Sequence, residues 1–319
     1  MEYVGLQTQK SRNNMRSLIL LVLFPMLVGA LLWLFSYLLV WLSVDHEYQP
    51  YYDVTGAANL FFVESLPYVM GAVLLWFVIA YFINTSIING ATHSKPLDRR
   101  DNKRIYNMVE NLCMAQGMPM PMVNVIEDDS LNAFASGINK KTYTVTLTRG
   151  IIEKLDDEEL EGVIAHELSH IRNNDVRLLI VSIVFVGIFT MIAQIALRAL
   201  MYGRFRSRGK NNGVIVIVIL VAVLAAIGYF FATMMRFAIS RKREYLADAG
   251  AAEMTKNPMA LANALRKISG NPDVEGIKRD DVAQLFIQHP LKSKKKSAFS
   301  SLFATHPPIE RRIKILEQF

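Results

Sequence analysis

The stretch Val163-Ile164-Ala165-His166-Glu167-Leu168-Ser169-His170-Ile171 determines how the rest of the chain is interpreted. On an α-helix, residues four positions apart lie one above the other, so His166 and His170 can direct two imidazoles to one metal ion. Glu167 directly follows the first histidine and is placed beside the open side of that metal, where a water binds. This H-E-x-x-H pattern predicts two zinc ligands and a general base. The alternative is two histidines that share a helix face without a common ligand.

The composition is that of a membrane protein with a moderate soluble part. The chain has 319 residues and a mean hydropathy of +0.25, with its apolar residues concentrated in a few long runs. The net charge of +7 is better explained by contact with anionic lipid head groups than by nucleic acid, and no nucleic-acid partner is expected. A single cysteine, Cys113, excludes an intramolecular disulfide and fits a reducing compartment. It lies in an apolar helical pattern, so we expect a buried structural thiol.

Four apolar runs predict transmembrane helices: Leu18–Leu42, Leu66–Ile88, Leu178–Leu197 and Val214–Met235. The first run is far longer than the roughly 7–15 apolar residues of a secretory signal. Basic residues precede it, whereas the segment 43–59 is acidic and contains no Lys or Arg. The positive-inside tendency therefore places the N-terminus and everything after the second span in the cytoplasm.

The third and fourth runs predict a transmembrane hairpin over residues 178–235. No proline separates His170 from the third run, so the motif helix is expected to continue straight into it, and the fourth run likewise into 236–253. The loop 202–213 is basic, which on the outer side of the hairpin opposes the positive-inside tendency. Both runs are about 20 residues long, enough to span a membrane, and this length favours a crossing hairpin. The basic run 292–296 is interpreted as a solvated loop.

The remaining parts of the chain predict a soluble domain built from two segments, 94–177 and 236–319, after two N-terminal spans in 1–93. Helical spacing runs from Arg99 to Gln116 and ends in Gly and Pro residues. Three short strands are expected at 122–126, 132–138 and 142–148. Acidic residues from Asp156 to Glu161 favour the start of the motif helix, because they complement its dipole.

A catalytic zinc ion takes three protein ligands and leaves one position for water, so a third ligand must come from elsewhere. The segment Arg243–Gly250 offers two carboxylates four residues apart, Glu244 and Asp248. Glu244 as a ligand, with Asp248 accepting a hydrogen bond from a ligand histidine, gives each carboxylate a physical role. The alternative is an exposed Glu and Asp that pair with Arg241 or Arg243.

Four motifs in order resemble the HtpX-type membrane zinc endopeptidases, bacterial relatives of the CAAX prenyl-protein proteases: N-A-F-A-S-G at 132–137, H-E-L-S-H, E-Y-L-A-D at 244–248 and T-H-P-P-I-E-R-R-I near the C-terminus. The resemblance covers nearly the whole chain and implies a cytoplasmic, zincin-like α+β catalytic domain with a small β-sheet and one Zn²⁺. It also implies that His306 and Arg312 lie near the oxyanion position, although His306 before two prolines would also suit a helix start. It further implies that Asn132, Ala133, Phe134 and Ala135 form the edge strand that aligns the substrate backbone. His289 and His93 are expected to be structural.

The resulting hypothesis is a multi-pass protease of the bacterial cytoplasmic membrane, with its active site facing the cytoplasm. Glu167 acts as the base, and the substrates are unfolded polypeptides or damaged membrane proteins, a class that rests on the resemblance. Three alternatives stay open: a narrow-specificity processing protease of the CAAX type, a non-enzymatic scaffold with a structural zinc, and a basic lipid-binding membrane protein. A structural zinc needs a fourth protein ligand, and a lipid-binding protein has no use for Glu167.

Overall fold

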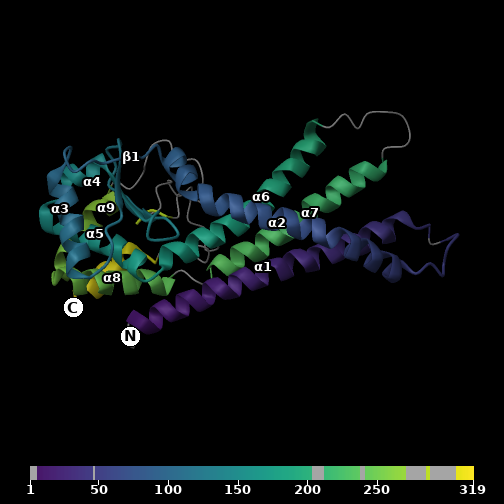
Figure 1. The fold of residues 1–319 in the computed structure, drawn as a ribbon, viewed down its shortest axis with the longest axis horizontal. Coiled ribbons are helices and arrows are strands. Elements are labelled where there is room, and N and C mark those ends of the chain that lie inside the picture. The colour runs from purple at the N-terminus through teal and green to yellow at the C-terminus, as the bar shows by residue number, and fades with distance from the viewer. Residues whose placement is uncertain (1–5, 46, 203–211, 238–240, 271–284, 288–306) are drawn as a thin grey trace. The chain divides into compact units, whose positions relative to one another are not determined.

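The computed structural model describes residues 6–45, 47–202, 212–237, 241–270, 285–287 and 307–319. These residues form long α-helices and one small β-sheet (Figure 1), as the sequence predicted. The chain divides into two compact units. The sheet unit comprises Met1–Ser17, Phe82–Val181 and Phe237–Phe319, and the apolar unit comprises Leu18–Tyr81 and Ser182–Arg236.

In the part of the chain that the structure describes, four helices are long and apolar enough to cross a membrane: α1 (Leu6–Ser43), α2 (Val54–Thr92), α6 (Asp175–Tyr202) and α7 (Asn212–Phe237). Each predicted span lies within one of these helices, which confirms the four predicted spans. The second helix begins well before the predicted start at Leu66. The Asp53 carboxylate accepts a hydrogen bond from the N–H of Gly56 at 2.8 Å, and such a side-chain cap stabilises a helix start at this point. At its other end, α2 stops at His93, whose φ of 53° is left-handed.

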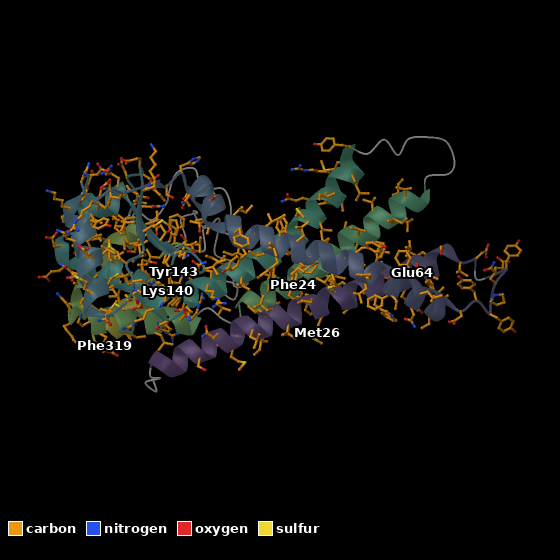
Figure 2. All side chains as sticks on the ribbon, viewed as in Figure 1. Phe24, Met26, Glu64, Lys140, Tyr143 and Phe319 are labelled. Atoms are coloured by element: carbon orange, nitrogen blue, oxygen red, sulfur yellow. The ribbon has the colours of Figure 1, made fainter. Side chains whose placement is uncertain are left out.

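Aromatic side chains join the helices within the apolar unit. The ring of Phe24 (labelled in Figure 2) stacks on that of Phe185 with centroids 4.0 Å apart. The indole N–H of Trp76 donates to the backbone carbonyl of Val184 at 3.3 Å. A Cβ at Gly228 would lie 2.3 Å from the Phe189 ring, so α7 needs a residue without a side chain where it meets α6.

The sheet has the order β1-β2-β4-β3, with β2 and β4 parallel and the other two pairs antiparallel. Strand β2 (Met122–Ile126) has the predicted bounds, whereas β3 (Ala133–Ser136) and β4 (Thr144–Thr148) are shorter than predicted. They are shorter because Gly137, with a φ of +100°, turns the chain between them. A Cβ there would lie 2.2 Å from the carbonyl oxygen of Thr142. The sequence analysis missed β1 (Lys95–Pro96), which is only two residues long.

Helices cover the sheet unit around the motif helix α5 (Asp157–Arg172). They are α3 (Lys103–Ala115), α4 (Arg149–Lys154), α8 (Arg241–Thr255), α9 (Pro258–Gly270) and α12 (Ile309–Leu316). Helix α5 packs against α8, α9 and β3. A Cβ at Gly250 of α8 would lie 2.4 Å from the hydroxyl of Ser169, and one at Gly162 would lie 3.1 Å from the backbone nitrogen of Leu261. Because these two glycines have no side chains, α8 and α9 can pack closely against the motif helix.

The motif helix does not continue into the third span, contrary to our expectation. It ends at Arg172, and a new helix, α6, begins at Asp175. Between them Asn174 has a φ of 61°, a left-handed conformation that Asn tolerates better than most residues. Its side-chain amide also donates to the Asn14 side chain at 3.1 Å. The chain can therefore break and restart here without either glycine or proline.

Several other expectations fall outside the described residues, and the structure adds nothing to them. They concern the join between α7 and α8, the basic loop after Tyr202, the run 292–296, His289 and His306.

Candidate metal centre

A capping box begins the motif helix. The Asp156 carboxylate accepts from the N–H of Glu159 at 2.9 Å, and the Glu159 carboxylate accepts from the N–H of Asp156 at 3.1 Å. Ten residues further along, His166 and Glu167 are buried, and His170 is half-buried with 13% of its side chain exposed. The acidic start that the sequence predicted therefore caps the helix that carries these three residues.

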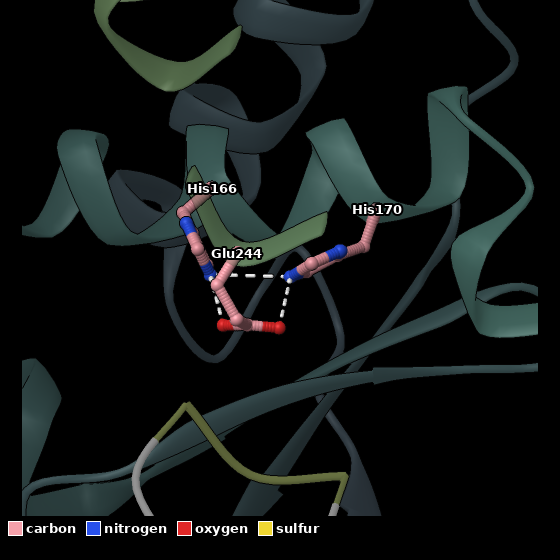
Figure 3. A group of neighbouring side chains, drawn as sticks. All are labelled: His166, His170 and Glu244. Carbon is pink, nitrogen blue, oxygen red and sulfur yellow. Dashed lines mark hydrogen bonds and ion pairs between the residues drawn. The ribbon is translucent and has the colours of Figure 1, made fainter. Parts of the chain in front are cut away.

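Three ligand atoms of His166, His170 and Glu244 converge within 4.8 Å of one another (Figure 3). The two Nε2 atoms are 3.2 Å apart, and the Glu244 oxygens lie 3.6 Å from Nε2 of His170 and 3.8 Å from Nε2 of His166. A tetrahedral zinc ion with bonds of about 2.0–2.2 Å separates its ligand atoms by roughly 3.3–3.6 Å. The spacing fits such an ion. Among the described residues no fourth Cys, His, Asp or Glu joins the group.

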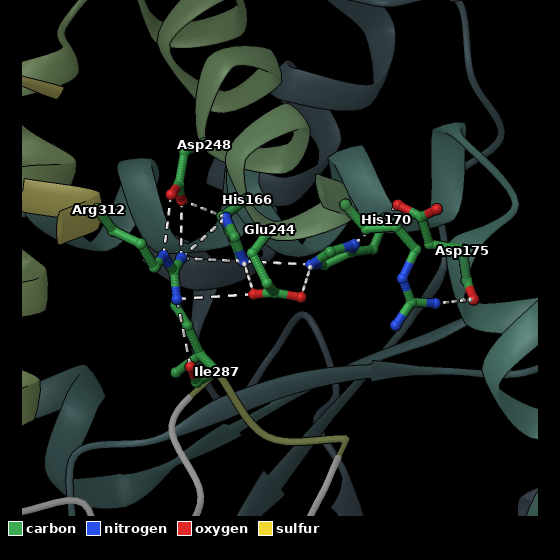
Figure 4. Close-up of polar contacts among 8 residues, drawn as sticks. His166, His170, Asp175, Glu244, Asp248, Ile287 and Arg312 are labelled. Atoms are coloured by element: carbon green, nitrogen blue, oxygen red, sulfur yellow. Dashed lines mark hydrogen bonds and ion pairs between the residues drawn. The ribbon is translucent and has the colours of Figure 1, made fainter. Parts of the chain in front are cut away.

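Each histidine is held from behind by a carboxylate. Asp248 lies 3.0 Å from Nδ1 of His166, and Asp175 lies 3.0 Å from Nδ1 of His170 (Figure 4). A carboxylate on Nδ1 fixes the proton there in a neutral imidazole, so both Nε2 atoms present lone pairs to the same point. Two lone pairs 3.2 Å apart beside a carboxylate require a positive charge between them. The donor set therefore suits a metal cation.

The pKa of His170 also indicates that a positive charge is favoured at this point. Burial alone would lower the pKa of His170, but the carboxylates of Glu244 and Asp175 outweigh it and raise that pKa to about 9. Burial and the Arg312 guanidinium lower the pKa of His166, which keeps this imidazole neutral. A metal ion must therefore displace one proton from the histidine pair, and metal binding weakens as the pH falls.

Glu167 is close both to the ligand group and to strand β3. Its side chain is buried, and the backbone N–H of Ala135 donates a hydrogen bond to its carboxylate. Burial, reinforced by the nearby Glu244 carboxylate, raises the pKa of Glu167 to about 7. A carboxyl group with this pKa can both accept and return a proton at neutral pH.

Arg312 is fully buried against the carboxylates of Asp248 and Glu244. Its Nε and Nη2 donate to the two oxygens of Asp248 at 2.9 and 2.7 Å, and its Nη1 lies 3.6 Å from a Glu244 oxygen. Although burial opposes it, this guanidinium lowers the pKa of Asp248 and keeps that carboxylate charged. The structure therefore brings Arg312 to the site, where two of its three nitrogens are bound to Asp248.

Strand β3 lies at an edge of the sheet, and it contains three of the four residues that the family resemblance implies for aligning a substrate. Its outer side already carries a short piece of the chain. Phe134 and Phe286 form an antiparallel bridge with ring centroids 4.7 Å apart, and Ile287 donates to the carbonyl of Ala133 at 2.8 Å. Asn132 instead accepts a hydrogen bond from the N–H of Thr148, on the inner side. The outward-facing backbone groups are therefore those of Ala133 and Ala135.

Sequence reasoning missed two residues of the site, Asp175 and Arg243. Asp175 was taken as part of a continuous helix, and Arg243 as a partner for an exposed carboxylate. Arg243 is instead buried, and its Nη1 donates to the backbone carbonyl of Asp175 at 3.2 Å. An acidic residue at the start of an apolar span was the available signal for Asp175, because such a residue needs a partner.

Comparisons with known proteins show the family of this chain. The model of peptidase family M48 matches residues 99–319. A protein of Bacteroides fragilis named protease HtpX homolog is 67% identical over 100% of both chains. A protein of Listeria monocytogenes with the same name is 39% identical over 78% of this chain and 87% of its own. The crystal structure of S. mikatae Ste24p aligns with a TM-score of 0.48 and 20% identity. The alignment covers 97% of this chain and 66% of the Ste24p chain.

The membrane-spanning helices and the buried ligand group define a membrane metalloprotease. The chain belongs to peptidase family M48, on the match to the family model and the full-length identity to HtpX homologues. Family membership overturns the two non-enzymatic alternatives, the zinc scaffold and the lipid-binding protein.

Proposed function

We propose that the metal is Zn²⁺, one per chain, held by His166, His170 and Glu244, and that the protein is an endopeptidase. The observation that carries this is the convergence of two imidazole Nε2 atoms and one carboxylate, 3.2–3.8 Å apart, with a carboxylate behind each imidazole. Three protein ligands leave a position for water, as in catalytic zinc sites.

Peptide hydrolysis then follows from the residues around the ion. When bound, Zn²⁺ acidifies a water and polarises the scissile carbonyl. Glu167 takes a proton from the attacking water and passes it to the leaving amine, a role that its pKa of about 7 supports. Arg312 and His306 stabilise the negative charge that develops on the carbonyl oxygen. The proximity of Arg312 to the Glu244 carboxylate, 3.6 Å, supports its part in this.

The substrate is proposed to add as a strand to the outer side of β3. The backbone groups of Ala133 and Ala135 face that side, and the N–H of Ala135 already bonds the Glu167 carboxylate. A strand bound there passes Glu167, the general base, and this places one of its peptide bonds beside the metal. Backbone recognition of this kind is independent of side chains and suits unfolded polypeptides.

We further propose that the sheet unit lies in the cytoplasm and that the natural substrates are misfolded or damaged membrane proteins, cut in their cytoplasmic segments. The acidic loop between the first two spans supports this orientation. The four spans and the HtpX homologues support the substrate class. A processing protease of the CAAX type is the second candidate, with the same chemistry and a narrower choice of peptide.

The test is metal content together with proteolysis of unfolded casein by the full chain in detergent. We expect one zinc per chain, casein cleavage that a chelator abolishes, and recovery on adding zinc. Activity that survives complete metal removal would exclude the mechanism. A defined peptide library separates the two candidates, since broad cleavage supports the degrading protease and cleavage of one motif supports the processing protease.

A further inference from the structure

The sheet unit contains a second carboxylate that orients a ligand histidine, and it belongs to the first residue of a predicted membrane span. Asp175 begins α6, and its carboxylate lies 3.0 Å from Nδ1 of His170. The residue is only 2% exposed. The left-handed Asn174 ends the motif helix and restarts the chain, which places Asp175 back against the histidine.

Asp175 is itself fixed from the opposite helix. The buried Arg243 of α8 donates from Nη1 to the backbone carbonyl of Asp175 at 3.2 Å. Arg243 directly precedes the third ligand, Glu244, in the sequence. The link therefore connects the start of α6, the end of α5 and the ligand-bearing turn of α8.

The site thus has two arms of the same composition. On one side His166 is followed by Asp248 and then Arg312, and on the other His170 is followed by Asp175 and then Arg243. Arg312 pairs with the carboxylate of Asp248, whereas Arg243 donates to the backbone carbonyl of Asp175.

A purely structural role for Asp175 would be to stabilise the N-terminus of α6 by its charge. The geometry assigns it more than that. A carboxylate serving only the helix end has no reason to lie within hydrogen-bond distance of an imidazole ring, and Asn174, not Asp175, occupies the position before the first residue of α6.

We propose that Asp175 is a positioning residue for metal binding. By accepting the Nδ1 proton of His170, it holds the tautomer whose Nε2 lone pair faces the metal and prevents rotation of the ring. Arg243 keeps Asp175 in place. This inference rests on the proposed metal site, and it assigns the His170 side a support equivalent to that of Asp248 on the His166 side.

The experiment measures zinc affinity by competition with a chromogenic chelator, using the full chain in detergent. Asp175→Leu removes the acceptor at similar volume and is expected to weaken zinc binding about 10–100-fold. Asp175→Asn keeps one acceptor oxygen and is expected to restore part of that loss. In the Co²⁺-substituted protein, Asp175→Leu should also change the visible absorption bands, which report ligand geometry directly.

The matched control is Asp156→Ala. It removes the side-chain cap at the start of α5, in the same unit, and leaves all three metal ligands in place. It should lower the thermal unfolding midpoint and leave the zinc affinity of the folded fraction unchanged. Zinc affinity of Asp175→Leu within twofold of the parent would overturn the inference, as would an equal loss in Asp156→Ala. If Asp175→Leu does not fold, Asp175→Ala, which also removes the acceptor, takes its place with the same criterion. A parent chain that binds no zinc would instead refute the proposed function.

Discussion

The backbone N–H of Ile287 donates a hydrogen bond to the carbonyl oxygen of Ala133, with 2.8 Å between the two atoms. One residue before it, Phe286 bridges to Phe134 and is fully buried. The residues 285–287 thus occupy the outer side of β3, where we propose that a substrate strand binds. A substrate must take over this acceptor from Ile287.

Replacing Ile287 with Pro removes the competing N–H, because proline has no amide hydrogen. We expect KM for a peptide substrate to fall by about 2–10-fold, the factor that corresponds to one hydrogen bond, with little change in kcat. Ile287→Ala, which keeps the N–H, serves as the control and should stay near the parent KM. A higher KM in the proline variant would show that 285–287 builds the substrate cleft and does not compete for it.

Glu167→Gln tests the general base. His166, His170 and Glu244 are intact in this variant, so we expect one zinc per chain to remain. Casein cleavage should fall by orders of magnitude, since the amide cannot accept the proton of the attacking water. Zinc analysis and casein digestion on the same preparation check both parts. Substantial turnover at neutral pH would remove Glu167 from this role.

Glu244→Ala and Asp248→Ala separate a metal ligand from its support. We expect the first variant to lose stoichiometric zinc and the second to bind it about 10–100-fold more weakly. Asp248→Ala also leaves the buried Arg312 without its bidentate partner, at a cost of about 3–5 kcal/mol in unfolding free energy. Chelator competition and thermal unfolding measure the two effects. If zinc loss were confined to Asp248→Ala, the two roles would have to be exchanged.

The Cys113 thiol should be protected in the folded protein. Burial raises its pKa to about 11, so at pH 8 roughly one thiol in a thousand is ionised. The folded pKa lies above the ordinary value of 9.0, so the thiol stabilises the fold below that pH and loses this contribution as the pH rises through about 11. Reaction with a thiol reagent should be slow in the native protein and fast after denaturation. Fast labelling at pH 8 without denaturant would contradict the burial.

A pair of single cysteines in a Cys113→Ser background tests the orientation in the membrane. Tyr51, 98% exposed between the first two spans, should react with a membrane-impermeant reagent in intact cells when replaced by Cys. Glu153→Cys, on the exposed surface of α4, should react only after the membrane is opened. The reverse pattern would place the sheet unit outside the cytoplasm.

Sequence patterns located those residues of the site whose geometry follows from one helix. His166 with His170, and Glu244 with Asp248, are each four residues apart, and helical periodicity alone puts each pair on one face. The structure brings these four together as predicted. The same patterns gave the four spans, although the start of α2 was missed because it depends on a local cap by Asp53.

The contribution of Asp175 could not be predicted in the same way. Its position depends on the left-handed turn at Asn174, and the absence of proline or glycine suggested a continuous helix. In a continuous helix, Asp175 would follow His170 by five residues and lie off its face. Likewise, nothing local to Phe286 indicates its pairing with Phe134, which is a contact between residues far apart in the chain.

The interleaving of the two units has a consequence for how the protein is made. The sheet unit is assembled from pieces on either side of α6 and α7, and Glu244 follows His170 by 74 residues (244 − 170). At about 5–20 residues per second, a ribosome needs roughly 4–15 s to pass from one ligand to the other. The last residue of the ligand group is therefore synthesised only after the last span, and the metal centre stays incomplete until all four spans have been translated.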